Sequence, residues 1–400
     1  MPGPLHGVRV IDLTTVVMGP YATQILGDYG ADVIKVEPPD GDIMRVPGPA
    51  RHPGMGHVYL NANRNKRGIV LDLKHESGRA ALLRLARDAD VLVYNVRPQA
   101  MKRLRLGYED IRAVNPRIVY AGAFGFGQQG PYAERPAFDD LIQAMSGAAE
   151  LLGRSMQGPP RFVPVNFCDR VSGLQVVNVI LAALFARERT GQGQAVDLPM
   201  FEAMAAFMLG EHLGGRSFVP PEGPMGYARI TTPFRRPYAT RDGYLVVLPY
   251  NDKQFAEFLA VIERPDLATD PRYATTAARA ANVGALYAFI EQEVARRTSG
   301  EWLERLGRTD LPHTAVLRIE DLFDDPHLQA VGFFTEIDHP TEGRLVVTAV
   351  PSNWSATQPS IRRHAPALGE HTVEVLREAG FSDAEIDRLL AEGAARGPKA

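Results

Sequence analysis

Strand-like and helix-like segments alternate along the first 200 residues of this 400-residue chain. The strand-like segments are short apolar runs rich in β-branched residues, and they span 8–13, 31–36, 68–73, 91–94, 117–120 and 195–198. The helix-like segments span 20–29, 76–89 and 170–187. Such alternation is typical of a parallel sheet with helices on both faces. The sequence therefore predicts an α/β protein with a Rossmann-like, doubly wound parallel sheet.

The pattern changes after about residue 212, where Gly, Pro and Arg become frequent. Shorter strands and helices follow, which indicates a second, smaller α+β domain. The predicted division is a large domain over 1–212, a linker over 213–224, a small domain over 225–330, a return to the large domain over 331–392 and a disordered tail over 393–400.

Composition and charge exclude several classes of function. A formal net charge of -3 at pH 7 gives no reason to expect a nucleic acid or an anionic membrane as a partner. The N-terminus has no basic segment followed by an apolar one, which argues against a secretory signal. The longest apolar run, 176–186, is shorter than the ~20 residues that span a bilayer. We therefore expect a cytoplasmic protein that does not bind membranes.

Metal and thiol chemistry find little support in the sequence. Cys168 is the single cysteine, so no disulfide and no cysteine-based zinc site can form within the chain. The ten histidines include no His-Glu-x-x-His pattern, and we expect no metal site. A lone cysteine at the end of an apolar run is more often a small core residue than a nucleophile, and we interpret Cys168 in that way.

Asp169 lies between an apolar run over 161–168, which we interpret as a strand, and the apolar helical segment that follows. Two roles fit this position. Aspartate is a preferred N-cap residue of helices, and position alone favours that role. A reference pKa of about 3.9 also makes aspartate an ionised nucleophile at neutral pH, and the dipole of the helix would help to keep it ionised. Position therefore leaves both a structural and a catalytic role open.

The segment Gly125-Phe126-Gly127-Gln128-Gln129-Gly130 matches the dinucleotide-binding fingerprint and follows a strand. That fingerprint requires a helix directly afterwards, but Pro131 and Pro136 prevent a regular helix before about Asp139. We therefore expect no nicotinamide or flavin site, and the segment is either a loop close to a ligand or a plain surface loop. The basic run over 63–67 could bind phosphates or form a solvated turn.

Several motifs occur together between about residues 5 and 392. They are Val10-Ile11-Asp12-Leu13-Thr14 with Gly19-Pro20, Gly30-Ala31-Asp32-Val33-Ile34-Lys35-Val36-Glu37, Asn63-Arg64-Asn65-Lys66-Arg67, Phe124-Gly125-Phe126-Gly127-Gln128-Gln129-Gly130-Pro131-Tyr132, Thr190-Gly191-Gln192-Gly193-Gln194 and Leu368-Gly369-Glu370-His371-Thr372. In this combination the chain resembles the family III CoA-transferases, which share their fold with the α-methylacyl-CoA racemases. The resemblance implies a chain that forms an open ring and a homodimer of two interlocked rings.

The resemblance also implies a chemistry for Asp169. In these transferases the matching aspartate attacks an acyl-CoA to give a mixed anhydride, and CoA then forms a thioester with the aspartate before it passes to the acceptor acid. The N–H groups of Gly125 and Gly127 are assigned as oxyanion donors. The CoA thioester is a substrate, and no tightly bound cofactor is expected. Positions that match the family's CoA contacts are Val16, Leu71, Lys74, Asn95, Arg103, Leu104 and Met200.

Departures from the family pattern bear on the reaction. Formyl-CoA transferases carry Gln where this chain has Val17, Arg where it has Pro38 and a glycine-rich loop near 247–253, so the departures argue against an oxalate and formate pair. A racemase needs a histidine base where this chain has Phe138, and phenylalanine cannot move a proton. Racemisation and non-catalytic CoA binding are therefore the less favoured alternatives to CoA transfer.

Three arginines lie where the linker enters the small domain: Arg229, Arg235 and Arg236. They could bind the second carboxylate of a dicarboxylic acid, because a guanidinium pairs readily with a carboxylate. Arginines in a loop are more often solvated, and that interpretation is favoured here. The expected partners are thus an acyl-CoA and a small carboxylic acid.

Overall fold

The computed structural model describes residues 2–398, and the chain forms two compact units. The larger unit comprises 1–147, 163–207 and 327–400, and the smaller unit comprises 148–162 and 208–326. The larger unit contains two extensive hydrophobic cores, and the smaller unit contains one of its own.

The boundaries at 207 and 327 lie a few residues before the predicted ones, and two longer segments are assigned differently. Residues 148–162, predicted as part of the large domain, belong to the smaller unit because α7 (Ala148–Ser155) packs against α10 (Ala228–Thr231). Residues 213–224, predicted as a linker, also belong to the smaller unit. They fold back on themselves, since the Gly215 N–H donates to the carbonyl of Pro224 at 3.0 Å.

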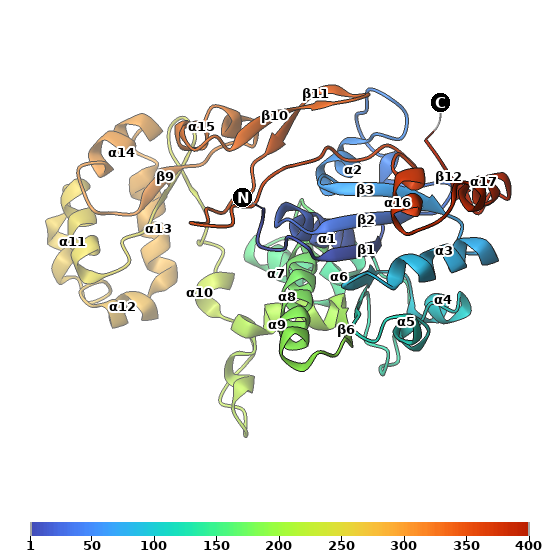
Figure 1. Cartoon of the computed structure of the whole chain (residues 1–400). Helices are drawn as coiled ribbons and strands as arrows, with labels where there is room; N and C mark the ends of the chain where they lie inside the picture. Colours follow the sequence, from blue (N-terminus) through green and yellow to red (C-terminus); the bar gives the residue numbers. More distant parts are fainter. Residues whose placement is uncertain (1, 399–400) are drawn as a thin grey trace. The chain divides into compact units, whose positions relative to one another are not determined.

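Within the described residues, the larger unit is built on a seven-stranded sheet with the order β12-β3-β2-β1-β4-β5-β6 (Figure 1). The strands are β1 (Arg9–Leu13), β2 (Asp32–Glu37), β3 (Lys66–Leu71), β4 (Val91–Tyr94), β5 (Val119–Phe124), β6 (Gln194–Pro199) and β12 (Ala395–Arg396). Neighbouring strands are parallel except for the edge strand β12. The prediction of a doubly wound, mostly parallel sheet is confirmed.

Strand β12 shows that the predicted disorder of 393–400 is wrong for part of that segment. Ala395 and Arg396 pair antiparallel with Leu71 and Val70. Ala394 and Ala395 are also buried. A two-residue strand is stabilised by its partner and leaves no periodic pattern in the sequence, which explains the error. Residues 399 and 400 lie outside the described part of the chain.

Helices cover both faces of the sheet (Figure 1). One face is covered by α1 (Met18–Asp28), α6 (Asp139–Met145), α8 (Phe167–Thr190) and α9 (Met200–His212). The other is covered by α3 (Glu76–Ala86), α4 (Pro98–Arg103), α5 (Tyr108–Val114), α16 (Thr372–Glu378) and α17 (Asp383–Ala391). In β4, Val91 and Val93 face the first layer while Leu92 and Tyr94 face the second. Burial on both faces explains why the strands are continuous apolar runs.

The remaining elements of the larger unit are short. They are the 3-10 helix η1 (Ile43–Arg45), helix α2 (His57–Ala62) and the antiparallel hairpin β10 (Phe334–His339) and β11 (Gly343–Thr348). Among the described residues, one helix, α8, is long and apolar enough to cross a membrane by length and composition. Half of that apolar window is buried, and α8 packs against α1, β5 and β6. These contacts are those of a core helix.

The smaller unit contains an antiparallel sheet in the order β7 (Tyr238–Ala239), β8 (Tyr244–Val247) and β9 (His313–Ala315). Its other elements are α7, η2 (Gly214–Ser217), α10, α11 (Asp252–Val261), η3 (Pro265–Thr269), α12 (Thr276–Ala281), α13 (Val283–Val294), α14 (Ser299–Leu306) and η4 (Glu320–Phe323). Helix α15 (Pro326–Ala330) leads back to the larger unit. Trp302 is fully buried, and its indole N–H donates to the Val294 carbonyl at 2.8 Å.

Candidate active site

The strand order of the large sheet reverses between β1 and β4. In doubly wound sheets, ligands bind at such a point, beyond the carboxyl ends of the strands. Here the loop 14–17 follows β1, and Asn95 follows β4. Asn95 Oδ1 accepts the Thr15 N–H at 3.0 Å, and Asn95 Nδ2 donates to the Thr15 carbonyl at 2.7 Å. Asn95, a predicted CoA contact, therefore uses its side-chain amide to hold this loop.

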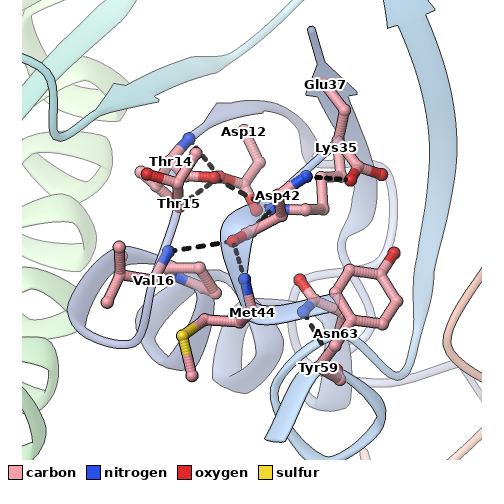
Figure 2. Close-up of polar contacts among 12 residues, drawn as sticks. Asp12, Thr14, Thr15, Val16, Lys35, Glu37, Asp42, Met44, Tyr59 and Asn63 are labelled. Carbon is pink, nitrogen blue, oxygen red and sulfur yellow. Dashed lines mark hydrogen bonds and ion pairs between the residues drawn. The ribbon is translucent and has the colours of Figure 1, made fainter. Parts of the chain in front are cut away.

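Val16, another predicted CoA contact, has a φ of 72°, which is rare for a β-branched residue. Its N–H donates to Asp42 Oδ1 at 3.2 Å (Figure 2). Asp42 also accepts the Met44 N–H at 3.0 Å and, through Oδ2, the Lys35 ammonium at 2.9 Å. Strained backbone conformations persist only where the surroundings enforce them, and they cluster at functional sites. Buried polar contacts thus hold the strained turn at the switch point.

Charged side chains next to this loop form a buried network (Figure 2). Asp12 in β1 lies in register with Lys35 in β2, and its carboxylate accepts the Lys66 ammonium at 3.0 Å. Although burial alone would raise it, the pKa of Asp12 is lowered to about 2 by the ammonium groups of Lys66 and Lys35. The Thr14 hydroxyl donates to the same carboxylate. Gly19 leaves room for the Thr14 side chain, since a Cβ at position 19 would lie 2.3 Å from the Thr14 Cβ.

The basic run over 63–67 contributes to buried ion pairs in this part of the unit. The Arg64 guanidinium lies 2.8 Å from Asp28, and the Arg67 guanidinium lies 2.7 Å from Asp32. Both arginines are buried. The two sequence interpretations, a phosphate site and a solvated turn, are therefore wrong. These cations are held by carboxylates from distant strands and helices.

Asp169 is the third residue of α8. The sequence predicted a strand before it and allowed it to be the N-cap of the helix, and the structure shows neither. No strand forms over 161–168, where Pro164 cannot donate to a ladder. The N-cap of α8 is Asn166, so the interpretation of Asp169 as the cap is wrong. The Asp169 N–H donates to Asp139 Oδ1 at 2.9 Å, and each of these aspartates is only 8% exposed. The Asp139 carboxylate therefore holds the backbone at the start of α8, and its charge acts on the nearby Asp169 carboxyl group.

This setting perturbs the titration of Asp169. Burial raises the pKa of Asp169 to about 7, the negative charge of Asp139 adds to the rise, and Arg170 opposes it. The dipole of α8 was expected to keep this carboxylate ionised, whereas burial and the charge of Asp139 act in the opposite direction and favour the protonated form. Burial also raises the pKa of the Cys168 thiol to about 12. Cys168 is a fully buried core residue, as predicted.

The glycine segment after β5 is not followed directly by a helix, because α6 begins at Asp139 as the two prolines predicted. Gly125 packs so closely on Ala137 that a Cβ would lie 2.1 Å from the Ala137 Cβ. The loop thus approaches the segment that carries Asp139. The Gly127 N–H donates to Glu202 Oε1 at 2.9 Å. Gly127 can therefore serve as an oxyanion donor only after Glu202 moves away.

The other predicted CoA contacts fall into two groups. Leu71 and Met200 are at most 3% exposed and pack in the two cores, so their side chains are not available to a ligand. Lys74 and Arg103 are exposed, and Leu104 is partly exposed. Arg103 lines a pocket of about 120 Å³ together with Arg97, Gln99 and Glu134. Phosphate binding by Lys74 and Arg103 stays a prediction.

The sequence did not suggest roles for three polar residues: Asp139 and Gln143 beside Asp169, and Glu202 at the glycine segment. Gln143 supports Asp139, since its Nε2 donates to Asp139 Oδ2 at 2.7 Å and its Oε1 accepts the Val163 N–H at 2.8 Å. The pair of aspartates that follows Phe138 was a visible signal for Asp139. Phe138 itself is 62% exposed and carries no titratable group.

Comparisons with known proteins agree with this architecture. Residues 5–372 match the model of CoA-transferase family III. The human succinyl-CoA:glutarate CoA-transferase is 32% identical over 394 residues, covering 98% of this chain and 89% of that protein. An acetyl-CoA:oxalate CoA-transferase from Acetobacter aceti is 36% identical, covering 96% of this chain and 97% of that protein. A crystal structure of a CAIB/BAIF family protein from Brucella suis superposes with a TM-score of 0.80 at 33% identity, covering 95% of this chain and 100% of that one.

A doubly wound sheet in which the loop 14–17 meets Asn95 where the strand order reverses is typical of α/β proteins that bind their ligand beyond the strand ends. The extent of the matches identifies the family: this chain belongs to CoA-transferase family III. As an enzyme of that family, it uses CoA thioesters as substrates.

Proposed function

We propose that this enzyme moves CoA from an acyl-CoA to a small carboxylic acid through covalent intermediates on Asp169. The observation that carries the proposal is the burial of the Asp169 carboxyl group at the start of α8, beside a second carboxylate. A poorly solvated carboxylate is a stronger nucleophile than one in water. The same burial protects a reactive thioester from hydrolysis.

The proposed reaction accounts for every oxygen atom. Asp169 attacks the acyl-CoA carbonyl, the CoA thiolate leaves, and a mixed anhydride forms. The thiolate then attacks the aspartyl carbonyl and releases the donor acid, which carries away one oxygen of Asp169. The acceptor carboxylate attacks the resulting aspartyl thioester, and the returning thiolate takes up the new acyl group. Asp169 is left with one oxygen from the acceptor.

This oxygen balance provides the test. With an acceptor acid labelled with ¹⁸O at both oxygens of its carboxylate, one labelled oxygen per turnover should reach Asp169, and the label should leave with donor acid released in later turnovers. Mass spectrometry of the released donor acid measures the transfer. A donor acid that contains only unlabelled or solvent oxygen would rule out the route through Asp169.

The raised pKa of Asp169 predicts how the transfer rate depends on pH. The ionised carboxylate is the nucleophile, so the rate should fall by about tenfold for each pH unit below pH 7. In Asp139→Asn the negative charge that raises the pKa is gone, and the midpoint should move to lower pH. Asp140→Asn, which changes the exposed neighbour, is the matched control and should leave the midpoint in place. Equal profiles for all three proteins would contradict the coupling of Asp139 to Asp169.

We further propose that the acceptor is a short dicarboxylic acid. One relative described above is named for succinyl-CoA and glutarate and the other for acetyl-CoA and oxalate, and in both names the acid after the CoA thioester has two carboxylates. With succinyl-CoA as donor, the transfer rate should therefore be higher for glutarate than for butyrate, which has the same carbon chain but lacks the second carboxylate. Faster transfer to butyrate would contradict the proposal.

A second copy of the chain is proposed as a partner. Large apolar side chains are exposed on consecutive helices of the larger unit, with Phe185 in α8 at 61% and Phe207 in α9 at 52%. A second chain that packs on α8 and α9 would cover these side chains. Light scattering should give a mass of about twice the 43.8 kDa of one chain, and a monomer at micromolar concentration would contradict the proposal.

A further inference from the structure

The smaller unit contains a pocket of about 450 Å³. This volume falls in the range of small-molecule sites. Its walls come from α10, the segment after β8, α12 and α13. The walls are mainly apolar, and they include Leu248, Val283 and Leu286. Polar groups gather at one place, where Arg229 lies beside Tyr250 and Tyr287.

Two arginines line this pocket, and their partners differ. Arg279 is 5% exposed, forms an ion pair with Asp252 and donates to the Tyr273 carbonyl at 2.8 Å. No carboxylate among the described residues forms an ion pair with Arg229. Its neighbours are phenols: Tyr287, Tyr227 and Tyr250 act on the guanidinium and raise its pKa. The guanidinium also lies 5.1 Å from the centre of the Tyr250 ring.

This arrangement defines the charge and shape of a ligand. A guanidinium pairs with a carboxylate through two parallel hydrogen bonds, and neighbouring phenol hydroxyls can donate to the same oxygens. The apolar walls suit a hydrocarbon chain. A phosphate would need more cations or backbone N–H groups than the one uncommitted cation here supplies. A carboxylate attached to a short hydrocarbon chain satisfies both parts of the pocket.

We propose that the pocket around Arg229 binds a carboxylate of a short-chain organic acid and thereby selects the acid that this transferase uses. The link to acid selection rests on the function proposed above, whereas binding itself does not depend on turnover. Arg229 is then a specificity-determining residue that carries no step of the acyl transfer.

Binding is tested first in the absence of turnover, with Asp169→Asn enzyme and isothermal titration. Glutarate should bind, and Arg229→Ala should weaken its binding by about tenfold or more. Glutaramide, which has the same length but no charge, should bind weakly and with no dependence on Arg229. Arg235→Ala is the matched control, because Arg235 is an exposed arginine of the same segment that does not line the pocket, and it should change nothing.

A second variant tests the same pocket without removing charge. Ala280 lines the pocket from α12 and is exposed, so Ala280→Phe should fill the space and weaken glutarate binding while the unit stays folded.

In the active enzyme, Arg229→Ala should raise the KM for the acid by about tenfold and leave the KM for the acyl-CoA unchanged. Glutarate binding unaffected by both variants would overturn the proposal. The proposal would also be overturned if these variants lost only the binding of adenosine 3′,5′-bisphosphate, a fragment of CoA. Failure of the ¹⁸O transfer would instead refute the role of Asp169 and leave this binding result standing.

Discussion

Replacing Asp169 with asparagine is expected to abolish CoA transfer and, at the same time, to make the folded protein more stable. Asparagine has nearly the same shape but cannot form an anhydride, so the transfer rate should fall by about a thousandfold or more. The gain in stability follows from the titration of the buried carboxyl group, whose pKa is raised from 3.8 to about 7.

The sign of the stability effect can be worked out from that shift. Between pH 4 and pH 7 the folded protein binds a proton at Asp169 that the unfolded chain releases, so this residue lowers the free energy of unfolding as the pH rises. Above pH 7 the full cost of burying the charge is present. Asparagine removes that cost, and the free energy of unfolding at pH 8 should rise by about 1–3 kcal/mol.

Denaturant unfolding of the two proteins at pH 5 and pH 8 measures this difference. The gain of the asparagine variant should be larger at pH 8 than at pH 5. A purely structural role at the helix start would leave the stability nearly unchanged, because asparagine caps helices about as well as aspartate. An asparagine variant that is no more stable than the original protein at pH 8 would therefore contradict the cost assigned to the buried carboxylate.

The second large expected effect is a loss of stability when the buried charge network next to the loop 14–17 is disrupted. Asp12→Ala removes the carboxylate that pairs with Lys66 and lies beside Lys35. Two fully buried ammonium groups would then have lost a counter-ion, which typically costs about 3–5 kcal/mol of stability. The pKa of Asp12 is lowered to about 2, so its contribution is present above pH 4 and is lost as the pH falls toward 2.

An exposed ion pair in the same unit provides the control. Glu109 lies 3.6 Å from Arg112 in α5, and both side chains are more than half exposed. Glu109→Ala should change the free energy of unfolding by at most about 1 kcal/mol, because solvent screens such pairs. Similar losses for Asp12→Ala and Glu109→Ala in urea unfolding would show that the network does not stabilise the fold.

The sheet was predictable because its strands are buried on both faces. Segments such as 91–94 consist of apolar residues without interruption, and the helices between them have the longer amphipathic period. The absence of a helix directly after the glycine segment was also predictable, since Pro131 and Pro136 act through local backbone geometry. These features depend on neighbours in sequence, which is why sequence patterns captured them.

The errors involve partners that are distant in sequence. The basic run over 63–67 was taken for phosphate-binding or solvated residues, whereas Arg64 pairs with Asp28 and Arg67 with Asp32. Charged residues inside otherwise apolar strands, such as Lys35 in β2, were an available signal for such pairing. The contact between Asp139 and the Asp169 backbone joins two helices 30 residues apart, and no local pattern announces it.

Direct observation of a CoA thioester on Asp169 tests whether this residue carries CoA. The enzyme is mixed with succinyl-CoA in the absence of an acceptor, quenched in acid within milliseconds to seconds, digested and analysed by mass spectrometry; in a parallel sample, hydroxylamine is added before the quench. We expect a peptide that carries CoA at Asp169 in the first sample, an Asp169 hydroxamate with release of CoA in the second, and neither product in Asp169→Asn. Rapid transfer by an enzyme that never shows an adduct at Asp169, or an adduct on another residue, would contradict this expectation.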